Sequence, residues 1–360
     1  MRSRQDNRLG KGGNDPGGRP PEGESGPGGA LLAPQDRRQL AREASRRLAQ
    51  AGMPVLPGLM LDAGARATRA YLEFLLASIR NRNTRLAYAR ALAGFLTWCE
   101  ERGRALERID PLTVAAYVER LTRERSAPTV KQHLAAIRML FDSLVLKQVV
   151  PFNPASSVRG PKHVVKRGKT PVLAAEQARH LLDSIDTGKI AGLRDRAIIA
   201  VMVYSFARVG AVVAMNVEDY YPDGKRFWLR LHEKGGKRHE VPAHHNAEAY
   251  LDAYIEAAGV AGEKRAPLFR TLDQHRQLTA ERITRNDVLR MVKRRAREAG
   301  LPHEISCHTF RATGITAYLE NGGTIENAQA IAAHESPRTT KLYDRTSDEI
   351  TLDEVERIAI

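Results

Sequence analysis

The chain has 360 residues, which is enough for two folded domains with their own hydrophobic cores. Its 57 Lys and Arg residues against 42 Asp and Glu residues give a net charge of +15, which favours a nucleic acid partner over a merely basic, soluble surface. Two cysteines exclude a disulfide framework or a zinc finger, and no apolar run is long enough for a membrane span or a secretory signal. We therefore expect a reduced, cytoplasmic protein that associates with the nucleoid.

Residues 1–60 are expected to form a disordered tail with one short helix. The first 30 residues hold nine glycines, four prolines and many charges, so almost nothing there can be buried. A solubilising tail is the favoured interpretation, and a basic arm that touches DNA is the alternative. Pro34 to Gly52 is rich in Arg, Gln and Ala and is predicted to form a short surface helix.

Residues 65–150 have the spacing of apolar residues that is typical of amphipathic helices. Asn83 is predicted to cap a helix that ends before Gly103. Asp110 followed by Pro111 is the pattern of another helix start. With a first helix around Ala70 to Ile79 and a fourth that begins near Pro128, the segment predicts a small bundle of four helices.

Residues 151–170 are predicted to link this bundle to a second domain. Prolines and glycines recur along the segment, and it has no acidic residue. A segment that only links two domains does not need an excess of positive charge. We therefore favour the interpretation that it is a strap that lies along DNA phosphates. Its candidate DNA-binding residues are Arg159, Lys162, Lys166, Arg167 and Lys169.

Residues 171–360 are predicted to form a mixed, mostly helical domain. The strand signals are confined to Arg226–His232 and Arg238–Pro242, and Gly235-Gly236 between them indicates a hairpin turn. The predicted fold class is therefore mainly α, with an N-terminal helical bundle and a second domain that carries one small antiparallel β-sheet. Helices are predicted at residues 174–185, 193–206, 208–215, 245–258, 285–299, 308–321, 325–333 and 337–343.

Two residues near the start of one predicted helix are candidates for binding a phosphate. His308 and Arg311 are three residues apart, so they share one face of the helix. Ser306 or Cys307 precedes this helix, which places both side chains near an N-terminus that favours an anion. The alternative is an ordinary His and Arg on an amphipathic surface, because the spacing alone is common.

Arg208 lies between two apolar segments, Ala197–Val203 and Ala211–Met215. A charge between two buried helices needs either a partner or a function. A structural salt bridge to Asp195 or Glu218 and a catalytic role are equally compatible with this position.

Three more residues complete a candidate site. Lys234 lies at a glycine-rich hairpin tip that can reach into a groove, although an ordinary solvated turn explains it as well. His334 ends one predicted helix, and Tyr343 lies on the next, where it could also belong to the core. Arg clamps two phosphate oxygens at once, Tyr is a known covalent nucleophile, and His and Lys move protons.

Together, two arginines, two histidines, a lysine and a tyrosine are suited to cutting a phosphodiester without a metal. His239, His244 and His245 suggest a metal site only weakly, because no Cys or carboxylate spacing supports it. A P-loop, a dinucleotide fingerprint and a Ser-His-Asp signature are all missing from the sequence. We therefore expect neither a metal nor a cofactor.

Over roughly residues 65–350 this combination resembles the tyrosine recombinase (phage integrase) family. Tyr204–Asp219 looks like that family's first arginine box, and the upstream bundle looks like its SAM-like core-binding domain. Without a folded arm-binding module, the chain is more similar to an Xer-type or transposon-borne recombinase than to lambda-like integrases. The residues that match the family's six catalytic positions are Arg208, Lys234, His308, Arg311, His334 and Tyr343.

The sequence departs from the family pattern at three alanines. Ala207 replaces a usual Leu, Ala211 stands where an acidic residue is common, and Ala333 replaces a frequent Gly. None of these changes removes a catalytic side chain, so the resemblance still implies an active enzyme.

The resemblance implies a site-specific DNA recombinase that is a monomer when free and a tetramer on two synapsed sites with inverted half-sites. Tyr343 would form a 3′-phosphotyrosyl bond, which keeps the bond energy and needs no cofactor. Arg208, Arg311 and His334 would hold the phosphate, while His308 and Lys234 would move protons. The alternatives are a type IB topoisomerase activity and a catalytically silent DNA-binding regulator.

Overall fold

The computed structural model describes residues 34–164, 168–233 and 236–344. The chain divides into two compact units, Met1–Val164 and Val165–Ile360, which are taken here one at a time. Within the described ranges no helix is long and apolar enough to cross a membrane. The tail predicted at residues 1–30, and Lys166, Arg167 and Lys234, lie outside the described residues.

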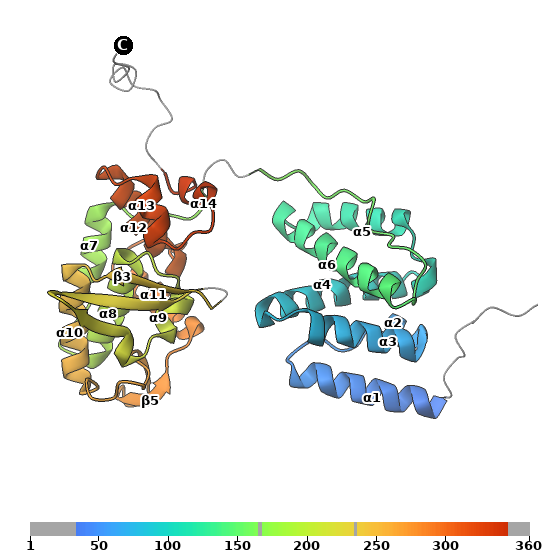
Figure 1. Cartoon of the computed structure of the whole chain (residues 1–360), viewed down its shortest axis with the longest axis horizontal. Helices are drawn as coiled ribbons and strands as arrows, with labels where there is room; N and C mark the ends of the chain where they lie inside the picture. Colours follow the sequence, from blue (N-terminus) through green and yellow to red (C-terminus); the bar gives the residue numbers. More distant parts are fainter. Residues whose placement is uncertain (1–33, 165–167, 234–235, 345–360) are drawn as a thin grey trace, which may run out of the picture. The chain divides into compact units, whose positions relative to one another are not determined.

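The first unit is entirely helical over its described residues (Figure 1). The four helices expected between residues 65 and 150 are present, and the first of them continues into a π-helical turn, Phe74–Ser78. The helices of this unit are α1 (Pro34–Gln50), α2 (Gly58–Asp62), α3 (Gly64–Glu73), α4 (Arg82–Glu100), α5 (Pro111–Glu124) and α6 (Ala127–Leu146), with a 3-10 turn at Leu106–Arg108.

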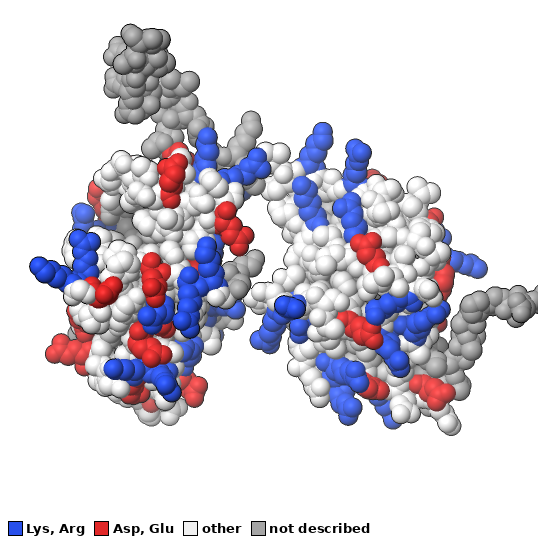
Figure 2. Space-filling view, viewed as in Figure 1, with Lys and Arg blue, Asp and Glu red and all other residues white. Residues whose placement is uncertain are grey.

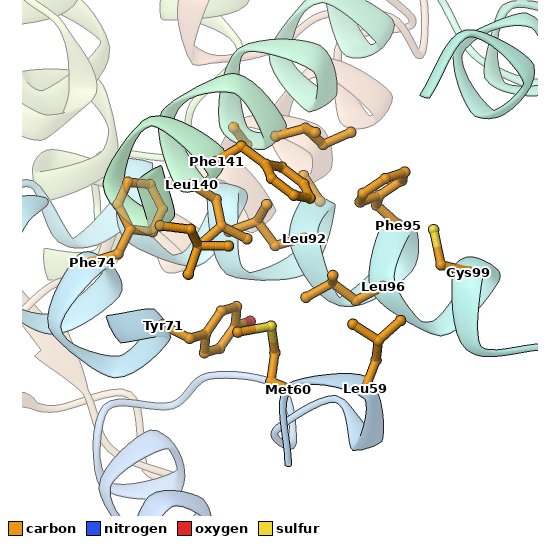
Figure 3. Close-up of a cluster of buried hydrophobic side chains, with 14 of the residues drawn as sticks. Leu59, Met60, Tyr71, Phe74, Leu92, Phe95, Leu96, Cys99, Leu140 and Phe141 are labelled. Carbon is orange, nitrogen blue, oxygen red and sulfur yellow. The ribbon is translucent and has the colours of Figure 1, made fainter. Parts of the chain in front are cut away.

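Aromatic and aliphatic side chains from α2, α3, α4 and α6 meet in the core of this unit (Figure 3). Phe95 on α4 is 0% exposed and packs edge-on against Phe141 of α6, with ring centroids 6.4 Å apart. Its ring also lies 5.0 Å from that of Tyr117 on α5. Such edge-to-face pairs stabilise the bundle beyond the burial of apolar area. The buried faces are the apolar stripes of the sequence, which is why these stripes predict the bundle.

The helix starts follow the expected capping chemistry, with one correction. Asp110 accepts a hydrogen bond from the Thr113 backbone N–H at 2.7 Å, with Pro111 in the first turn, as predicted. Asn83 is not the cap of α4: the Asn81 side chain accepts from the backbone N–H groups of Asn83 and Thr84. Both residues are asparagines, so the composition of the segment alone does not say which one caps.

Residues 34–60 are ordered and do not belong to the disordered tail that we expected over residues 1–60. The helix predicted at Pro34–Gly52 is the 17-residue α1, and it is not confined to the surface, because Ala44 and Leu48 are each 1% exposed in the core. In α2, Leu59 and Met60 are also buried. These apolar contacts give the segment the burial that a disordered chain lacks.

The predicted linker is held against the first unit over its first half. The Arg138 side chain donates hydrogen bonds to the backbone carbonyls of Ala155, at 3.0 Å, and Val158. The Asn153 side chain donates in return to the Arg138 carbonyl at 3.0 Å. Ala155 and Val158 are buried, so the predicted strap along DNA phosphates is confined to the part beyond them.

The second unit is mixed and mostly helical, as predicted (Figure 1). All eight predicted helices are present, and their ends differ from the prediction by at most three residues. They are α7 (Ala175–Asp183), α8 (Ile190–Tyr204), α9 (Val209–Ala214), α10 (His245–Ala258), α11 (Arg285–Glu298), α12 (Cys307–Glu320), α13 (Ile325–Ile331) and α14 (Pro337–Lys341).

The strands are more numerous than the sequence predicted. Arg226–His232 (β2) and Arg238–Pro242 (β3) pair antiparallel, as expected, but Tyr220–Asp223 (β1) adds a third strand on the other edge of β2. Arg270–Leu272 (β4) and Leu278–Arg282 (β5) form a second, two-stranded sheet. The restriction to two strands was therefore wrong, because β1 and β4 are too short to show an alternating apolar pattern.

Helix α12 lies directly against α8, and this close packing depends on one glycine. A Cβ atom at Gly314 would lie 2.0 Å from the Val203 carbonyl oxygen and 2.8 Å from the Phe206 ring. No larger residue fits there without a shift of backbone. The approach brings the start of α12, with His308 and Arg311, next to the segment that leads from α8 to α9.

Candidate active site

The start of α12 presents two of the candidate residues. Ser306 precedes the helix, as one of the two predicted options, and its N–H donates to the Thr309 hydroxyl at 3.1 Å. His308 and Arg311 follow within the first turns, as the spacing predicted. Arg311 is 1% exposed, so it is not an ordinary surface residue of an amphipathic helix.

Tyr343 reaches the same place from the end of the described chain. It lies in the turn just after α14 and is 7% exposed. Its hydroxyl forms a 2.8 Å hydrogen bond with Nε2 of His308, and the Thr316 hydroxyl donates to its backbone carbonyl at 2.9 Å. A nucleophile within hydrogen-bond reach of a base is the arrangement that covalent catalysis requires.

His334 closes the site on the other side of the tyrosine. Its ring lies almost parallel to that of Tyr343, with an interplanar angle of 9° and centroids 5.8 Å apart. Nδ1 is hydrogen-bonded to the Thr340 hydroxyl at 2.9 Å, which leaves Nε2 for another partner. Ala333, just before it, has φ = 48°, a conformation that glycine adopts at lower cost.

Arg311 is held by two backbone carbonyls. It donates to Phe206 and, at 2.6 Å, to Ala332. Phe206 has φ = 54°, and Ala333, which shares a peptide bond with Ala332, has φ = 48°. One carbonyl at this guanidinium thus belongs to a left-handed residue, and the other precedes one. Strained backbone of this kind persists where the surrounding structure enforces it, and it is common at functional sites.

Burial and nearby positive charge lower the pKa values of Arg311, His334 and His308. Burial and the nearby Arg208 lower the pKa of Arg311 to about 10, so its side chain is still charged at pH 7. Burial, followed by Arg311 and Arg208, lowers the pKa of His334 to about 3 and also lowers that of His308. Both histidines are therefore neutral at pH 7, and His308 can accept a proton from Tyr343.

Arg208 stands at the start of α9, and its partner differs from both expected ones. It forms an ion pair with Glu233, whose side chain is 3% exposed. Asp195, one of the two expected partners, is fully buried and instead binds three other arginines: Arg194, Arg294 and Arg295. Arg208 is 36% exposed over its side chain, so its guanidinium is open to a ligand while the carboxylate holds it.

The structure therefore brings together most of the residues that the sequence singled out. His308, Arg311, His334 and Tyr343 lie in direct contact or one side chain apart, and Arg208 is close enough to lower the pKa of Arg311. Three supporting side chains were not predicted: Glu233, Thr316 and Thr340. No spacing rule connects these residues to the site, so the sequence carries no local signal for them.

The candidate DNA-binding residues of the linker that the structure describes are Arg159, Lys162 and Lys169. All three are exposed. Within the described ranges none of them forms a salt bridge. Their charge is thus available to a phosphate backbone.

The depressed pKa of His334 predicts a specific dependence of stability on pH. Above pH 6.5, the ordinary pKa of a histidine, His334 is neutral in the folded and the unfolded chain. Between pH 6.5 and about 3 only the unfolded chain takes up this proton, so the free energy of unfolding should fall as the pH falls, by about 2 kcal/mol at pH 5. Urea unfolding of wild type and His334→Gln at pH 7.5 and pH 5 measures the contribution. If the free energy of unfolding falls between pH 7.5 and pH 5 by no more in wild type than in the variant, the prediction is wrong.

Two family models cover most of the chain. The model described as "Phage integrase family" matches residues 171–349, and the model described as "Phage integrase, N-terminal SAM-like domain" matches residues 69–148. The second match spans helices α4 to α6 and part of α3, and the first spans every residue of the candidate site.

Curated relatives and solved structures agree with these matches. The chain is 31% identical over 288 residues to "Tyrosine recombinase XerC" of Pelobacter propionicus, over 78% of this chain and 90% of the relative. It is 28% identical to "Tyrosine recombinase XerD" of Listeria monocytogenes, over 76% and 91%. A XerH recombinase bound to a palindromic difH substrate shares the fold with a TM-score of 0.62 at 17% identity, over 87% of this chain and 86% of that one. A lambda integrase dimer bound to a COC′ core site does so with a TM-score of 0.60 at 20% identity, over 79% and 97%. The chain therefore belongs to the phage integrase family of tyrosine recombinases.

Proposed function

We propose that this chain is a site-specific DNA recombinase that cuts and rejoins DNA through a 3′-phosphotyrosyl intermediate on Tyr343. The observation that carries the proposal is the 2.8 Å hydrogen bond between the Tyr343 hydroxyl and Nε2 of His308, inside a site that also holds Arg311 and His334. The proposed nucleophile follows α14, while the proposed base and the phosphate-binding Arg311 both come from α12.

In the first step the Tyr343 oxygen attacks the scissile phosphorus. The new bond joins that oxygen to phosphorus, the bond from phosphorus to the 5′ oxygen breaks, and the phenol proton passes to neutral His308. Lys234, which follows Glu233 in the sequence, is proposed to protonate the leaving 5′ oxygen. A 5′-hydroxyl from the partner duplex then reverses these steps, so the energy of the phosphodiester is kept throughout.

Arg208, Arg311 and His334 are proposed to hold the phosphate as negative charge grows on its oxygens. Fixed hydrogen-bond donors, here two charged arginines and a neutral histidine, stabilise such charge strongly in a site that excludes water. Because Arg311 is 1% exposed and Tyr343 is 7% exposed, we propose that the tyrosine segment moves when the phosphate binds. The short α14 and the turn after it carry Tyr343 and are the parts proposed to shift.

The same relatives support a proposed partner and assembly. Solved structures of similar fold include a XerH recombinase on its difH substrate and a lambda integrase tetramer on a Holliday junction. We propose double-stranded DNA with inverted half-sites as the partner, a monomer in solution and a tetramer on paired sites. Residues 65–150 would bind the core site, 171–360 would carry the chemistry, and the protein would act in the cytoplasm on the nucleoid.

Recombination, rather than relaxation or binding alone, can be tested on a plasmid with two copies of the recognised site. The site is first selected from random-sequence DNA by its binding to the wild-type protein. A recombinase yields two products of exchanged length, a type IB topoisomerase relaxes the plasmid without exchange, and a silent regulator leaves it supercoiled. We expect exchanged products, and relaxation of plasmids without the site would instead support the topoisomerase.

The basic linker is proposed to contact phosphates, and this predicts a salt dependence. Each neutralised phosphate contributes about 0.9 to the slope of log K against log salt, so loss of four contacts should flatten the slope by roughly 3–4. The charge-reversed variant carries Lys162→Glu, Lys166→Glu, Arg167→Glu and Lys169→Glu. A matched control reverses four basic residues elsewhere in the second unit: Lys225, Arg226, Lys264 and Arg265. Equal slopes of log K against log salt for the two variants would mean that the linker does not contact phosphates and only joins the domains.

A further inference from the structure

Glu233 is a buried carboxylate that the reaction as described does not use. It follows β2 directly, and its side chain is 3% exposed. Its backbone N–H donates to the Lys237 carbonyl at 2.9 Å, and its carbonyl accepts from the Gly236 N–H at 3.2 Å. Glu233 is thus the residue at which the hairpin that carries Lys234 closes.

The carboxylate of Glu233 is paired with Arg208, a residue of the candidate site. A buried carboxylate is costly unless a cation and hydrogen bonds satisfy it. Its ion-pair partner is Arg208, which stands 25 residues earlier at the start of α9. Glu233 is also near enough to Arg311 to act on its pKa, which it raises against the lowering effects of burial and Arg208.

No other carboxylate among the described residues is paired with Arg208. Ala211, one turn further along α9, is 2% exposed and carries no charge. Asp195 is engaged with its own three arginines. Arg208 and Arg311 are the two cations of the proposed phosphate clamp, and they repel each other. Glu233 is the carboxylate that offsets this repulsion.

We propose that Glu233 is a positioning residue that holds the Arg208 guanidinium in the phosphate site and ties it to the hairpin that bears Lys234. The inference rests on the recombinase function proposed above. A planar guanidinium has five N–H donors, so Arg208 can keep Glu233 on one edge while another edge binds a phosphate oxygen. Glu233 acts through Arg208 and does not touch the reacting atoms.

The test uses full-length protein and a suicide duplex, nicked next to the cleavage point, that carries the site selected by the wild-type protein. Glu233→Gln keeps the shape of the side chain but removes its charge. We expect single-turnover formation of the covalent adduct to slow by about tenfold or more, a smaller loss than removal of a transition-state donor, while the Kd for the duplex changes by less than about twofold. The matched control, Glu240→Gln, removes a carboxylate from β3 of the same hairpin, where Glu240 pairs with Arg230, and should cleave like wild type.

A double-mutant cycle separates positioning from a general structural role. If Glu233 acts through Arg208, then Glu233→Gln added to Arg208→Ala should slow cleavage no further, within about twofold. Losses that multiply in the double variant would overturn the proposal. So would a wild-type rate in folded Glu233→Gln.

Two outcomes keep the test decisive. Thermal melting followed by circular dichroism checks that each variant is folded. If Glu233→Gln is not folded, Glu233→Asp replaces it, because aspartate keeps the charge but shortens the reach to Arg208. A wild-type cleavage rate in Glu233→Asp would also overturn the proposal. Failure of the wild-type protein to form any adduct would refute the proposed function itself, and it is seen before any variant is compared.

Discussion

Tyr343→Phe is expected to abolish covalent protein–DNA adducts while site binding stays within about twofold of wild type. The change removes one oxygen, the atom that lies 2.8 Å from Nε2 of His308. Without it no phosphotyrosyl bond can form at this position. The ring of Tyr343 packs against His334 and is kept by phenylalanine, so the fold of the site should survive. A suicide duplex run on a denaturing gel measures the adduct.

The matched control is Tyr318→Phe on α12. Tyr318 is another tyrosine of the same subdomain, with its ring 6.0 Å from that of Phe206. This variant should form adducts like wild type. Adducts that persist in Tyr343→Phe would place the nucleophile elsewhere, and Tyr318 and Tyr204 would be the first residues to replace.

Arg208→Ala and Arg311→Ala should each slow cleavage by at least ~10²-fold, the usual loss when one transition-state donor is removed. DNA binding should change far less, because most of its energy comes from many other phosphate contacts. Single-turnover cleavage at saturating protein measures the chemical step apart from binding. The control, Arg290→Ala, removes an exposed arginine of α11 and should have no effect.

The two arginine variants should differ in stability. Arg311 satisfies the buried carbonyls of Phe206 and Ala332, and each buried acceptor left without a donor costs about 1–3 kcal/mol. Arg208 is 36% exposed over its side chain and serves mainly Glu233. Arg311→Ala should therefore lower the free energy of unfolding more than Arg208→Ala, as urea unfolding can show. Near wild-type cleavage by both variants would refute the phosphate clamp.

Local sequence patterns predicted the helices and part of the site well, because their causes are local. The Asp110-Pro111 cap and the three-residue spacing of His308 and Arg311 depend on neighbours within one turn, so the sequence displays them directly. Strand β1 was not predicted, because it is four residues long and contains Pro222, which an edge strand tolerates but which gives no strand signal.

The partners within the site could not be predicted from spacing, because tertiary contacts create them. Asp195 and Glu218 were the acidic residues nearest to Arg208 in sequence, yet Arg208 pairs with Glu233 from another element. The carbonyls that hold Arg311 belong to Phe206, 105 residues earlier, and Ala332, 21 residues later. The family resemblance supplied the proposed catalytic positions, but it named no residue that positions them.

The central claim is that Tyr343 becomes covalently joined to a 3′-phosphate of DNA. The direct measurement is mass spectrometry of the wild-type adduct after digestion with protease and nuclease. We predict a nucleotide on the peptide that contains Tyr343, joined through a 3′-phosphate, with a free 5′-hydroxyl on the released strand. A nucleotide attached to any other residue, or a 5′-phosphate linkage, would contradict the account.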